Sequence, residues 1–485
     1  MNTFPLLTCI VFLPLACGLA GLAVQRQPNQ VRILCLVSLL AELALLLAIP
    51  GMTGYSELHL REDFTWIAPL HVRYTLAMDG FSYVMAILTV FLGGLGILAS
   101  WREIEHQVAG FHALLMASLT SALGVFLAQD VFLFYLFWEL QLVPMFFLIG
   151  RYGHEERRQA ATKFVLFSIA GGLPLLLAVI QLMLTRTDLS LTALTAMPPT
   201  PAVQHWLFAA FLLAFAVKTP LVPVHTWLPD AHTQAPTAGS LLLAGVLLKT
   251  GAYAILRWAL PLFPQTAGVV APWLAGIGVL GLFYASWIAL AQTDLKRLVA
   301  YSSVAHMGMI MLGLAADTLL SLSGAVLQMI SHALTTGGLF IMVGMLVERT
   351  GSREFSVFAG MWKRMPIFGA FFLFFAMAAA GLPGLSQFVG EIMILMGSFA
   401  AWPVLTSLAL GGLVVGLVYI LKMVHATLYG PVNESPDIEF VDLCPREIAV
   451  LAPLALAVLW LGLHPSSVLD FVNGPLLTLA AAVPK

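Results

Sequence analysis

The sequence predicts an all-α, polytopic membrane protein of about fourteen transmembrane helices. Of its 485 residues, 60% are hydrophobic and only 9% are charged, and the mean hydropathy is +0.96. Soluble domains carry roughly 25% charged residues, so water cannot be the solvent for most of this surface. A spanning helix needs about 20 apolar residues. Apolar runs of about this length lie near residues 3–24, 31–51, 79–100, 111–128, 131–150, 161–184, 205–222, 238–260, 268–291, 299–316, 320–347, 368–400, 403–428 and 445–465.

Residues 1–100 are predicted to form the N-terminal helices and one outer β-hairpin. No lysine or arginine precedes Arg26, whereas a cleaved signal peptide begins with basic residues, so the first run is expected to stay as a helix. In the long loop at 52–78, residues 55–61 and 71–75 alternate between apolar and polar side chains. Such alternation between turn residues is typical of a short hairpin.

The rest of the single membrane domain (1–485) is divided into two predicted repeats, 111–260 and 268–428, and a last span with its tail, 445–485. The stretch from Val246 to Arg257 resembles the stretch from Val418 to Tyr429, and each contains a lysine, which hints at an internal duplication. Two units of five helices each would start on opposite sides of the membrane, which is the inverted-repeat plan of many transporters. The tail has an apolar run of only nine residues, 475–483, which is too short to cross.

The seventh and twelfth spans are predicted to be broken helices. Pro220 follows Lys218 within its apolar run, and proline removes a backbone donor and clashes with the preceding turn. Carbonyl groups freed at such a break can face water or the lysine. The segment from Gly381 to Gly384 places a second break near Pro383, in a run longer than one straight span requires.

The basic residues predict the orientation. Cytoplasmic loops of membrane proteins carry an excess of lysine and arginine. If both termini lie outside, the inner loops of this chain hold most of its basic residues, as this tendency expects. The inner loops then hold Arg26, Arg32, Arg102, Arg151, Arg157, Arg158, Lys163, Lys296, Arg297, Arg349, Arg353, Lys363, Arg364 and Arg446, and the outer segments hold Arg61, Arg73, Arg186, Arg257 and Lys485.

Four charged residues within the predicted spans are the primary candidates for function: Glu139, Lys218, Lys249 and Glu391. A charge at mid-membrane costs about 2.5–3.5 kcal/mol on insertion scales, so it needs a partner or water. The alternatives are a neutral, hydrogen-bonded acid at a helix contact for Glu139 and snorkelling to the interface for the lysines. Lys249 lies near the midplane of its span, where snorkelling is hardest.

Other polar residues in the spans are secondary candidates. His306 and His332 lie between the charged centres, and histidine titrates near neutrality, so they are either proton carriers or structural. Lys422 is either a relay member or a lysine that snorkels to the inner interface. Glu42, in the second span, is expected to be protonated or to lie at a helix contact.

Two classes of site are excluded. The four cysteines show no CxxC or Cys/His spacing, so neither a metal nor an iron–sulfur cluster is expected in this chain. The net charge of −2 argues against binding nucleic acid, which demands a basic face.

Four stretches resemble the antiporter-like subunits of respiratory complex I: Phe137–Pro144 (FWELQLVP), His225–Gly239 (HTWLPDAHTQAPTAG), Ala300–Gly308 (AYSSVAHMG) and Gly381–Gly384 (GLPG). The resemblance runs over nearly the whole chain and extends to Mrp-type cation/proton antiporters and membrane-bound hydrogenases. Within complex I it is greatest for the M type. The L type has a long C-terminal lateral helix, and the L and N types usually carry lysine where this chain has Glu391.

The resemblance implies a role for each candidate. Glu139 and Lys218 would form an ion pair, Lys249 would be the central relay, and Glu391 would be the exit-side site. The helix breaks at Pro220 and Pro383 match the family. Lys422 and the pair His306 and His332 match less firmly defined parts of the axis.

The implied protein is a proton-translocating membrane subunit of an NADH-quinone oxidoreductase in a bacterial inner (plasma) membrane. Its partners would be the L-, N- and K-type membrane subunits, the peripheral redox arm and the lipid bilayer. FMN, Fe–S clusters and quinone would lie in partner subunits, with no cofactor in this chain. Moving Glu139 away from Lys218 would make Lys218 a better proton donor, because a nearby opposite charge stabilises the charged lysine.

Three alternatives stay open. The chain could belong to an Mrp-type Na⁺/H⁺ antiporter or a membrane-bound hydrogenase, although sodium prefers oxygen ligands and an axis of lysines suits protons. It could be a passive membrane scaffold for redox subunits. A solute carrier would need a substrate cavity, and nothing in the sequence specifies one.

Overall fold

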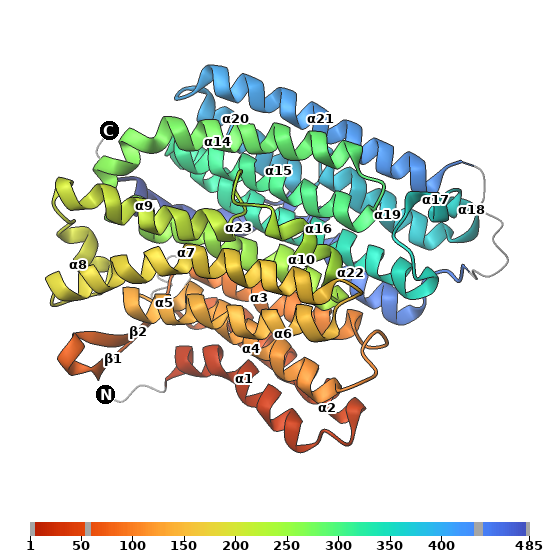
Figure 1. Cartoon of the computed structure of the whole chain (residues 1–485), viewed down its shortest axis with the longest axis horizontal. Coiled ribbons are helices and arrows are strands. Elements are labelled where there is room, and N and C mark those ends of the chain that lie inside the picture. The colour runs from red at the N-terminus through yellow and green to blue at the C-terminus, as the bar shows by residue number, and fades with distance from the viewer. Residues whose placement is uncertain (1–4, 54–59, 431–439, 482–485) are drawn as a thin grey trace.

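The computed structural model describes residues 5–53, 60–430 and 440–481, and apart from one hairpin it is built of helices (Figure 1). Thirteen of its helices are long and apolar enough to cross a membrane. The two shorter helices α19 and α20 together cover the one remaining apolar run. The predicted fold class, a polytopic all-α membrane protein with about fourteen spans, is therefore confirmed.

The first part of the chain contains the hairpin and the helices that precede the first break. These elements are α1 (Leu6–Ala23), α2 (Pro28–Thr53), β1 (Leu60–Ile67), a 3₁₀ turn (Ala68–Leu70), β2 (Val72–Met78), α3 (Gly80–Ala99), α4 (Val108–Leu127), α5 (Val131–Leu140), α6 (Leu142–Tyr152), α7 (Arg157–Thr185), α8 (Leu191–Ala196) and α9 (Pro201–Lys218). The strands β1 and β2 pair antiparallel. Of the alternating residues that predicted the hairpin, 55–59 lie outside the described residues.

The second part of the chain begins after the first break. Its elements are α10 (Trp227–Gln234), α11 (Thr237–Leu242), a π-helical segment (Leu243–Leu247), α12 (Leu248–Ala254), a second π-helical segment (Ile255–Ala259), α13 (Leu260–Leu262), α14 (Pro264–Ala291), α15 (Leu295–Ala316), α16 (Leu319–Thr350), α17 (Phe355–Phe358), α18 (Met361–Arg364), α19 (Pro366–Ala379), α20 (Ser386–Phe399), α21 (Pro403–Leu428), α22 (Pro445–Leu463) and α23 (Ser466–Ala481).

The long helices run side by side along the long axis of the molecule (Figure 1). The hairpin and α8 lie at one end of the bundle, which we call the hairpin end, and α17 and α18 lie at the opposite end, the α17 end. Carboxylates fix several helix starts. The side chain of Asp130 accepts hydrogen bonds from the backbone N–H groups of Phe132 and Leu133, and the side chain of Asp294 accepts one from that of Arg297. Such N-caps satisfy donors that the first helical turn leaves free.

Both predicted helix breaks are present. The helix α9 ends at Lys218, and residues 219–226 separate it from the short helix α10. Residues 380–385 separate α19 from α20, and Gly381 and Gly384 adopt φ angles of +72° and +92°. These angles lie in the left-handed region that glycine reaches without steric cost, which explains why this break is rich in glycine.

Burial decreases from the centre of the bundle to its edges. The span formed by α11 to α13 is 100% buried inside this single chain, whereas α21 is only 28% buried. Charged residues on the central helices are therefore shielded from lipid by the chain itself. The tail helix α23 packs on α3 and α16, and Ser323 of α16 donates a hydrogen bond to Asn473 at 2.8 Å.

Candidate functional site

Lys249 lies at the centre of the molecule on α12, between the two π-helical segments, and its side chain is fully buried. Its ammonium donates to the carbonyl oxygen of Ala244, with Nζ and O 2.5 Å apart. It also lies 2.5 Å from Nδ1 of His332, which comes from α16. The π-helical segments are sites of irregular hydrogen bonding, a feature that is frequent at functional positions. Lys249 thus joins the two predicted repeats through a histidine.

Polar side chains continue from His332 toward the second helix break. The rings of His332 and His306 pack edge to face with centroids 5.5 Å apart. A ring nitrogen of His306 lies 2.9 Å from the amide nitrogen of Gln387, and its Nδ1 lies 3.6 Å from Oε1 of Glu391. All four side chains are buried. The two histidines therefore connect Lys249 to Glu391.

Glu391 lies on α20 beside the break that precedes this helix. The side-chain amides of Gln328 and Gln387 reach its Oε1 at 3.4 and 3.5 Å. A Cβ atom on Gly381 would come within 2.5 Å of its other oxygen. The absence of a side chain at Gly381 is what lets the carboxylate approach the broken backbone.

Lys218 is buried at the end of α9, where the first break begins. Its ammonium donates to Oε1 of Gln141 at 3.3 Å and lies 5.3 Å from the ring centre of Trp138. The hydroxyl of Thr250, the neighbour of Lys249 in sequence, lies 3.5 Å from the same oxygen of Gln141. Gln141 thus stands between the position of Lys218 and the helix that carries Lys249.

Glu139 does not contact Lys218 directly. Within the described residues no ion pair joins them, and the Oε1 atom of Glu139 is buried without a hydrogen-bond partner. Their charges are nevertheless close enough to interact electrostatically. The ion pair that the resemblance implies is therefore a longer-range interaction in this structure, and Gln141 takes the direct contact with the lysine.

Lys422 lies apart from this set of residues. Its side chain is exposed, and its ammonium donates to the carbonyl oxygen of Leu290 at 2.7 Å. That carbonyl is in the last turn of α14, where a cation is favourable because of the helix dipole. The structure thus gives Lys422 a contact at a helix end and does not place it among the residues from Lys249 to Glu391.

His232 is a functional candidate that the sequence reasoning missed. It lies on α10, is fully buried, and stacks on the ring of Phe340 with centroids 4.5 Å apart. Neither ring nitrogen has a hydrogen-bond partner among the described residues. Its position lets it interact electrostatically with both Lys249 and Lys296. The signal was its place in the stretch HTWLPDAH, which carries two histidines after the first break.

A polar cavity of about 650 Å³ opens at the α17 end. Glu103, His154 and Lys296 are among the residues that line it. Burial raises the pKa of the Glu103 carboxyl. The hydrogen bond that this carboxyl accepts from the backbone N–H group of Thr237 acts in the opposite direction. Burial, with help from the nearby charge of Lys296, lowers the pKa of His154 to about 4.

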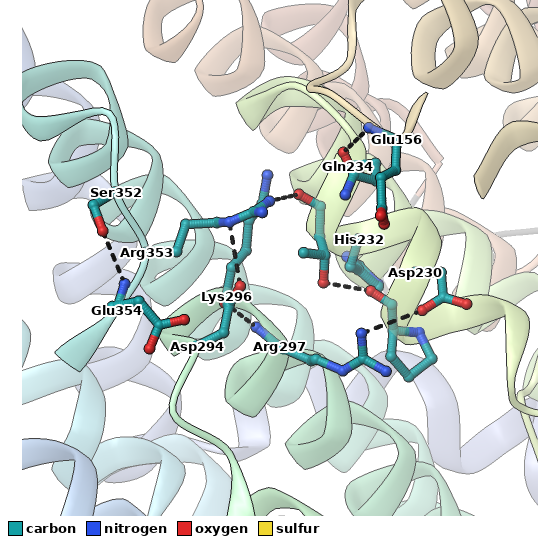
Figure 2. A network of polar contacts seen from close by, with 12 residues as sticks. Glu156, Asp230, His232, Gln234, Asp294, Lys296, Arg297, Ser352, Arg353 and Glu354 are labelled. Atoms are coloured by element: carbon teal, nitrogen blue, oxygen red, sulfur yellow. Dashed lines mark hydrogen bonds and ion pairs between the residues drawn. The ribbon is translucent and has the colours of Figure 1, made fainter. Parts of the chain in front are cut away.

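The short helix α10 is surrounded by charged side chains at the same end of the molecule (Figure 2). Lys296 donates to the carbonyl oxygen of Ala235 at 2.6 Å, and Arg353 donates to that of Thr233 at 2.7 Å. Asp230 forms ion pairs with Lys163 at 2.6 Å and with Arg297 at 3.4 Å. Within the part of the chain that the structure describes, no group of three or more His, Cys, Asp or Glu residues is placed to hold a metal ion.

Comparisons with known proteins identify similar chains. Residues 128–416 match a family described as the transmembrane part of NADH:quinone oxidoreductase and Mrp antiporters. A curated relative, NADH-quinone oxidoreductase subunit M of Pseudomonas aeruginosa, is 45% identical, and the match covers 87% of this chain and 85% of the relative.

Two solved structures share the fold over nearly the whole length. A chain of respiratory complex I from Thermus thermophilus has a TM-score of 0.91 and is 29% identical, with 99% of this chain and 100% of that chain covered. A chain of the Mrp complex from a Dietzia species has a TM-score of 0.88, with 99% and 98% covered. Its identity is 20%, so the similarity to that chain shows the fold alone.

Proposed function

The chain belongs to the family of NADH:quinone oxidoreductase and Mrp antiporter transmembrane subunits, and on this premise we propose that it is an M-type, proton-translocating subunit of an NADH-quinone oxidoreductase. Curated relatives that are 45% and 44% identical to this chain carry the name of that subunit. The partners would be the other membrane subunits and the redox subunits of such a complex. The electron carriers FMN, Fe–S clusters and quinone would lie in those partners.

The proposed proton path follows the buried polar residues along the centre of the bundle. It runs from Lys218 past Gln141 to Lys249, and then through the histidines to Glu391. The single observation that carries the proposal is the contact between Lys249 and His332. It places a titratable base 2.5 Å from a fully buried ammonium group, which is within reach for direct proton transfer.

Charge coupling explains how the path would use energy. The charge on Glu139 stabilises the protonated form of Lys218 from a distance, so a change in the position or charge of Glu139 alters how readily Lys218 gives up its proton. Moving one charge against the membrane potential requires about 2.3 kcal/mol per 100 mV. This energy would come from the redox reaction in partner subunits and reach the chain as a displacement or a change of charge near Glu139.

The membrane would be the inner membrane of a bacterium, with the hairpin end outside and the α17 end inside. The distribution of lysine and arginine supports this orientation, because the loops at the α17 end hold most of them. Protons would then enter through the polar cavity near Lys296 and leave on the side of Glu391.

Replacing Lys249 with methionine tests the proposal. The variant keeps the size of the side chain and removes the proton carrier, so we expect the rate of NADH-driven proton translocation in membrane vesicles to fall by about 10²-fold or more. Lys422→Met is the matched control, because it removes an exposed lysine that lies apart from the path.

The outcomes separate the proposal from its alternatives. A passive scaffold would translocate protons normally with Lys249→Met, provided that the amount of assembled complex is unchanged. A sodium/proton antiporter would instead show transport that depends on sodium concentration. Either result would contradict the assignment of Lys249 as a proton carrier of the redox complex.

A further inference from the structure

The short helix α10 belongs to the first predicted repeat and contacts helices of both repeats. It is joined to Lys218 by residues 219–226, which are not helical, and to α11 by the turn at Ala235 and Pro236. It packs against α7, which lies in the first predicted repeat, and against α15, which lies in the second. Any movement of one repeat relative to the other must therefore act on α10.

Asp230 receives one cation from each predicted repeat. Lys163 comes from α7, and its Nζ lies 2.6 Å from Oδ2 of Asp230. Arg297 comes from α15, and its guanidinium lies 3.4 Å from Oδ1 (Figure 2). Among the described residues, Asp230 is the only carboxylate that pairs with cations from both repeats. The carboxylate thus forms a bridge between α7 and α15.

The opposite end of α10 is held by further contacts. Arg353 and Lys296, both from the second predicted repeat, donate to the last carbonyl groups of α10 and of the turn that follows it. From the first repeat, the backbone N–H group of His154 donates to the carbonyl oxygen of Gln234 at 2.9 Å. Cations at a helix C-terminus are stabilising because of the helix dipole. Both ends of α10 are therefore fixed by both repeats.

The position of α10 matters because this helix carries His232. Lys296 lines the polar cavity and donates to the carbonyl of Ala235 just after α10, and the charges of Lys296 and Lys249 both act on the imidazole. Asp230 and His232 are two residues apart on one short helix, so a displacement at Asp230 moves the imidazole as well. A shift of about 1 Å in a proton-transfer group is enough to lower a rate strongly.

We infer that Asp230 is a positioning residue that holds α10 between the two halves of the protein, so that His232 stays in line between Lys296 and Lys249. This inference rests on the proposed function and deepens it. It assigns to the Lys163–Asp230–Arg297 bridge the control of how tightly proton movement follows electron transfer. Asp230 itself touches neither Lys249 nor the other proton carriers.

Replacing Asp230 with asparagine in the complete complex tests this role. The amide keeps the shape and removes the charge that pairs with both cations. We expect the complex to assemble and to oxidise NADH in inverted membrane vesicles, while the number of protons moved per electron falls by about two-fold or more. Asp230→Glu keeps the charge, and we expect it to restore most of the ratio.

A matched control breaks an ion pair at the same end without touching α10. Glu447→Gln removes the pair with Arg349, which joins α16 to α22 at 2.7 Å. If this control lowers the ratio as much as Asp230→Asn does, or if Asp230→Asn retains the ratio of the unmodified complex, the inference is wrong.

A second variant covers the case in which Asp230→Asn does not assemble. The double replacement of Lys163 and Arg297 by glutamine removes both cations and keeps Asp230, and we expect the same loss of protons per electron. A normal ratio in this variant would overturn the inference. The Lys249→Met variant separates the two cases. If the proposed function is wrong, Lys249→Met translocates protons normally. If only the inference about Asp230 is wrong, Lys249→Met still loses proton translocation.

Discussion

Small residues determine where two carboxylates can lie, that of the half-buried Glu139 and that of the buried Glu391. A Cβ atom on Gly172 of α7 would come within 2.1 Å of Oε1 of Glu139, and one on Gly381 would come within 2.5 Å of Oε2 of Glu391. In both cases the missing side chain leaves room for a carboxylate beside backbone atoms. Glu139 is held by this packing and lacks a hydrogen bond at Oε1, so its position can respond to forces from outside the chain.

The pKa shift of His154 predicts how stability depends on pH. His154 lies between α6 and α7 at the α17 end, and burial lowers its pKa from the usual 6.5 to about 4. Between these values the unfolded chain binds a proton that the folded chain does not. The contribution of His154 to stability is therefore complete above pH 6.5 and is lost as the pH falls toward 4.

The variant His154→Gln should flatten part of this dependence. We expect the apparent melting temperature of the purified complex to fall less steeply between pH 7 and pH 5 than that of the unmodified complex. His106→Gln is the control for removing an imidazole, because His106 lines the same cavity with an exposed side chain. Identical slopes for His154→Gln and the unmodified complex would contradict the assignment.

Sequence reasoning reached the charged residues of the path and missed their polar neighbours. Lys249 and Glu391 are recognisable in the sequence because a charge within an apolar run is costly and needs a partner or water. Gln141 and His232 carry no fixed charge, and only the packing of α6 and α10 shows that they face the path. The ion pair of Glu139 and Lys218 was implied by resemblance, and the direct contact with Gln141 depends on rotamers that no sequence pattern encodes.

At the scale of elements, the breaks were predictable and the π-helical segments were not. Pro220 and the motif at 381–384 mark the breaks, because proline and glycine act on the backbone directly. The π-helical segments at 243–247 and 255–259 contain no proline, and their one glycine, Gly245, has an ordinary helical backbone without a positive φ angle. They lie in the central span, where every residue is buried, and burial is a property of tertiary packing that the local sequence does not display.

The break between α19 and α20 allows a comparison of two glycines. Gly381 and Gly384 both have positive φ, so alanine at either site costs about 1–3 kcal/mol of backbone strain. Only at Gly381 does the new methyl group also displace Glu391, because nothing lies within 4 Å of a Cβ atom on Gly384.

We therefore expect Gly381→Ala to lower proton translocation well beyond Gly384→Ala at a similar level of assembled complex. The measurements are the proton translocation rate in vesicles and the amount of the chain in the purified complex. Equal activities in the two variants would mean that the position of Glu391 against the break is unimportant.

At the scale of the whole molecule, hydropathy was sufficient to predict the number of spans but not the helix that the tail forms. The described helices account for every apolar run, because each run has the length that a bilayer imposes. The tail was expected to stay out of the membrane as a short apolar run, and it forms the helix α23. Its apolar residues Val468, Val472 and Leu476 recur every four positions and pack on the bundle, a pattern too short to stand out by hydropathy.

The orientation of the whole bundle is the last prediction. An excess of lysine and arginine at the α17 end predicts that this end lies in the cytoplasm and the hairpin end outside. Thr65 of the hairpin and Lys363 of α18 are exposed at opposite ends and suit single-cysteine labelling in a background without the four native cysteines. In right-side-out vesicles a membrane-impermeant maleimide should label Thr65→Cys and spare Lys363→Cys, and inverted vesicles should give the reverse. Because an even number of spans returns the chain to the side where it started, a cysteine at the exposed Ser466, which follows the last span α22, should be labelled together with Thr65→Cys. Labelling of that site with Lys363→Cys instead would require an odd number of crossings and would invalidate the proposed direction of proton movement.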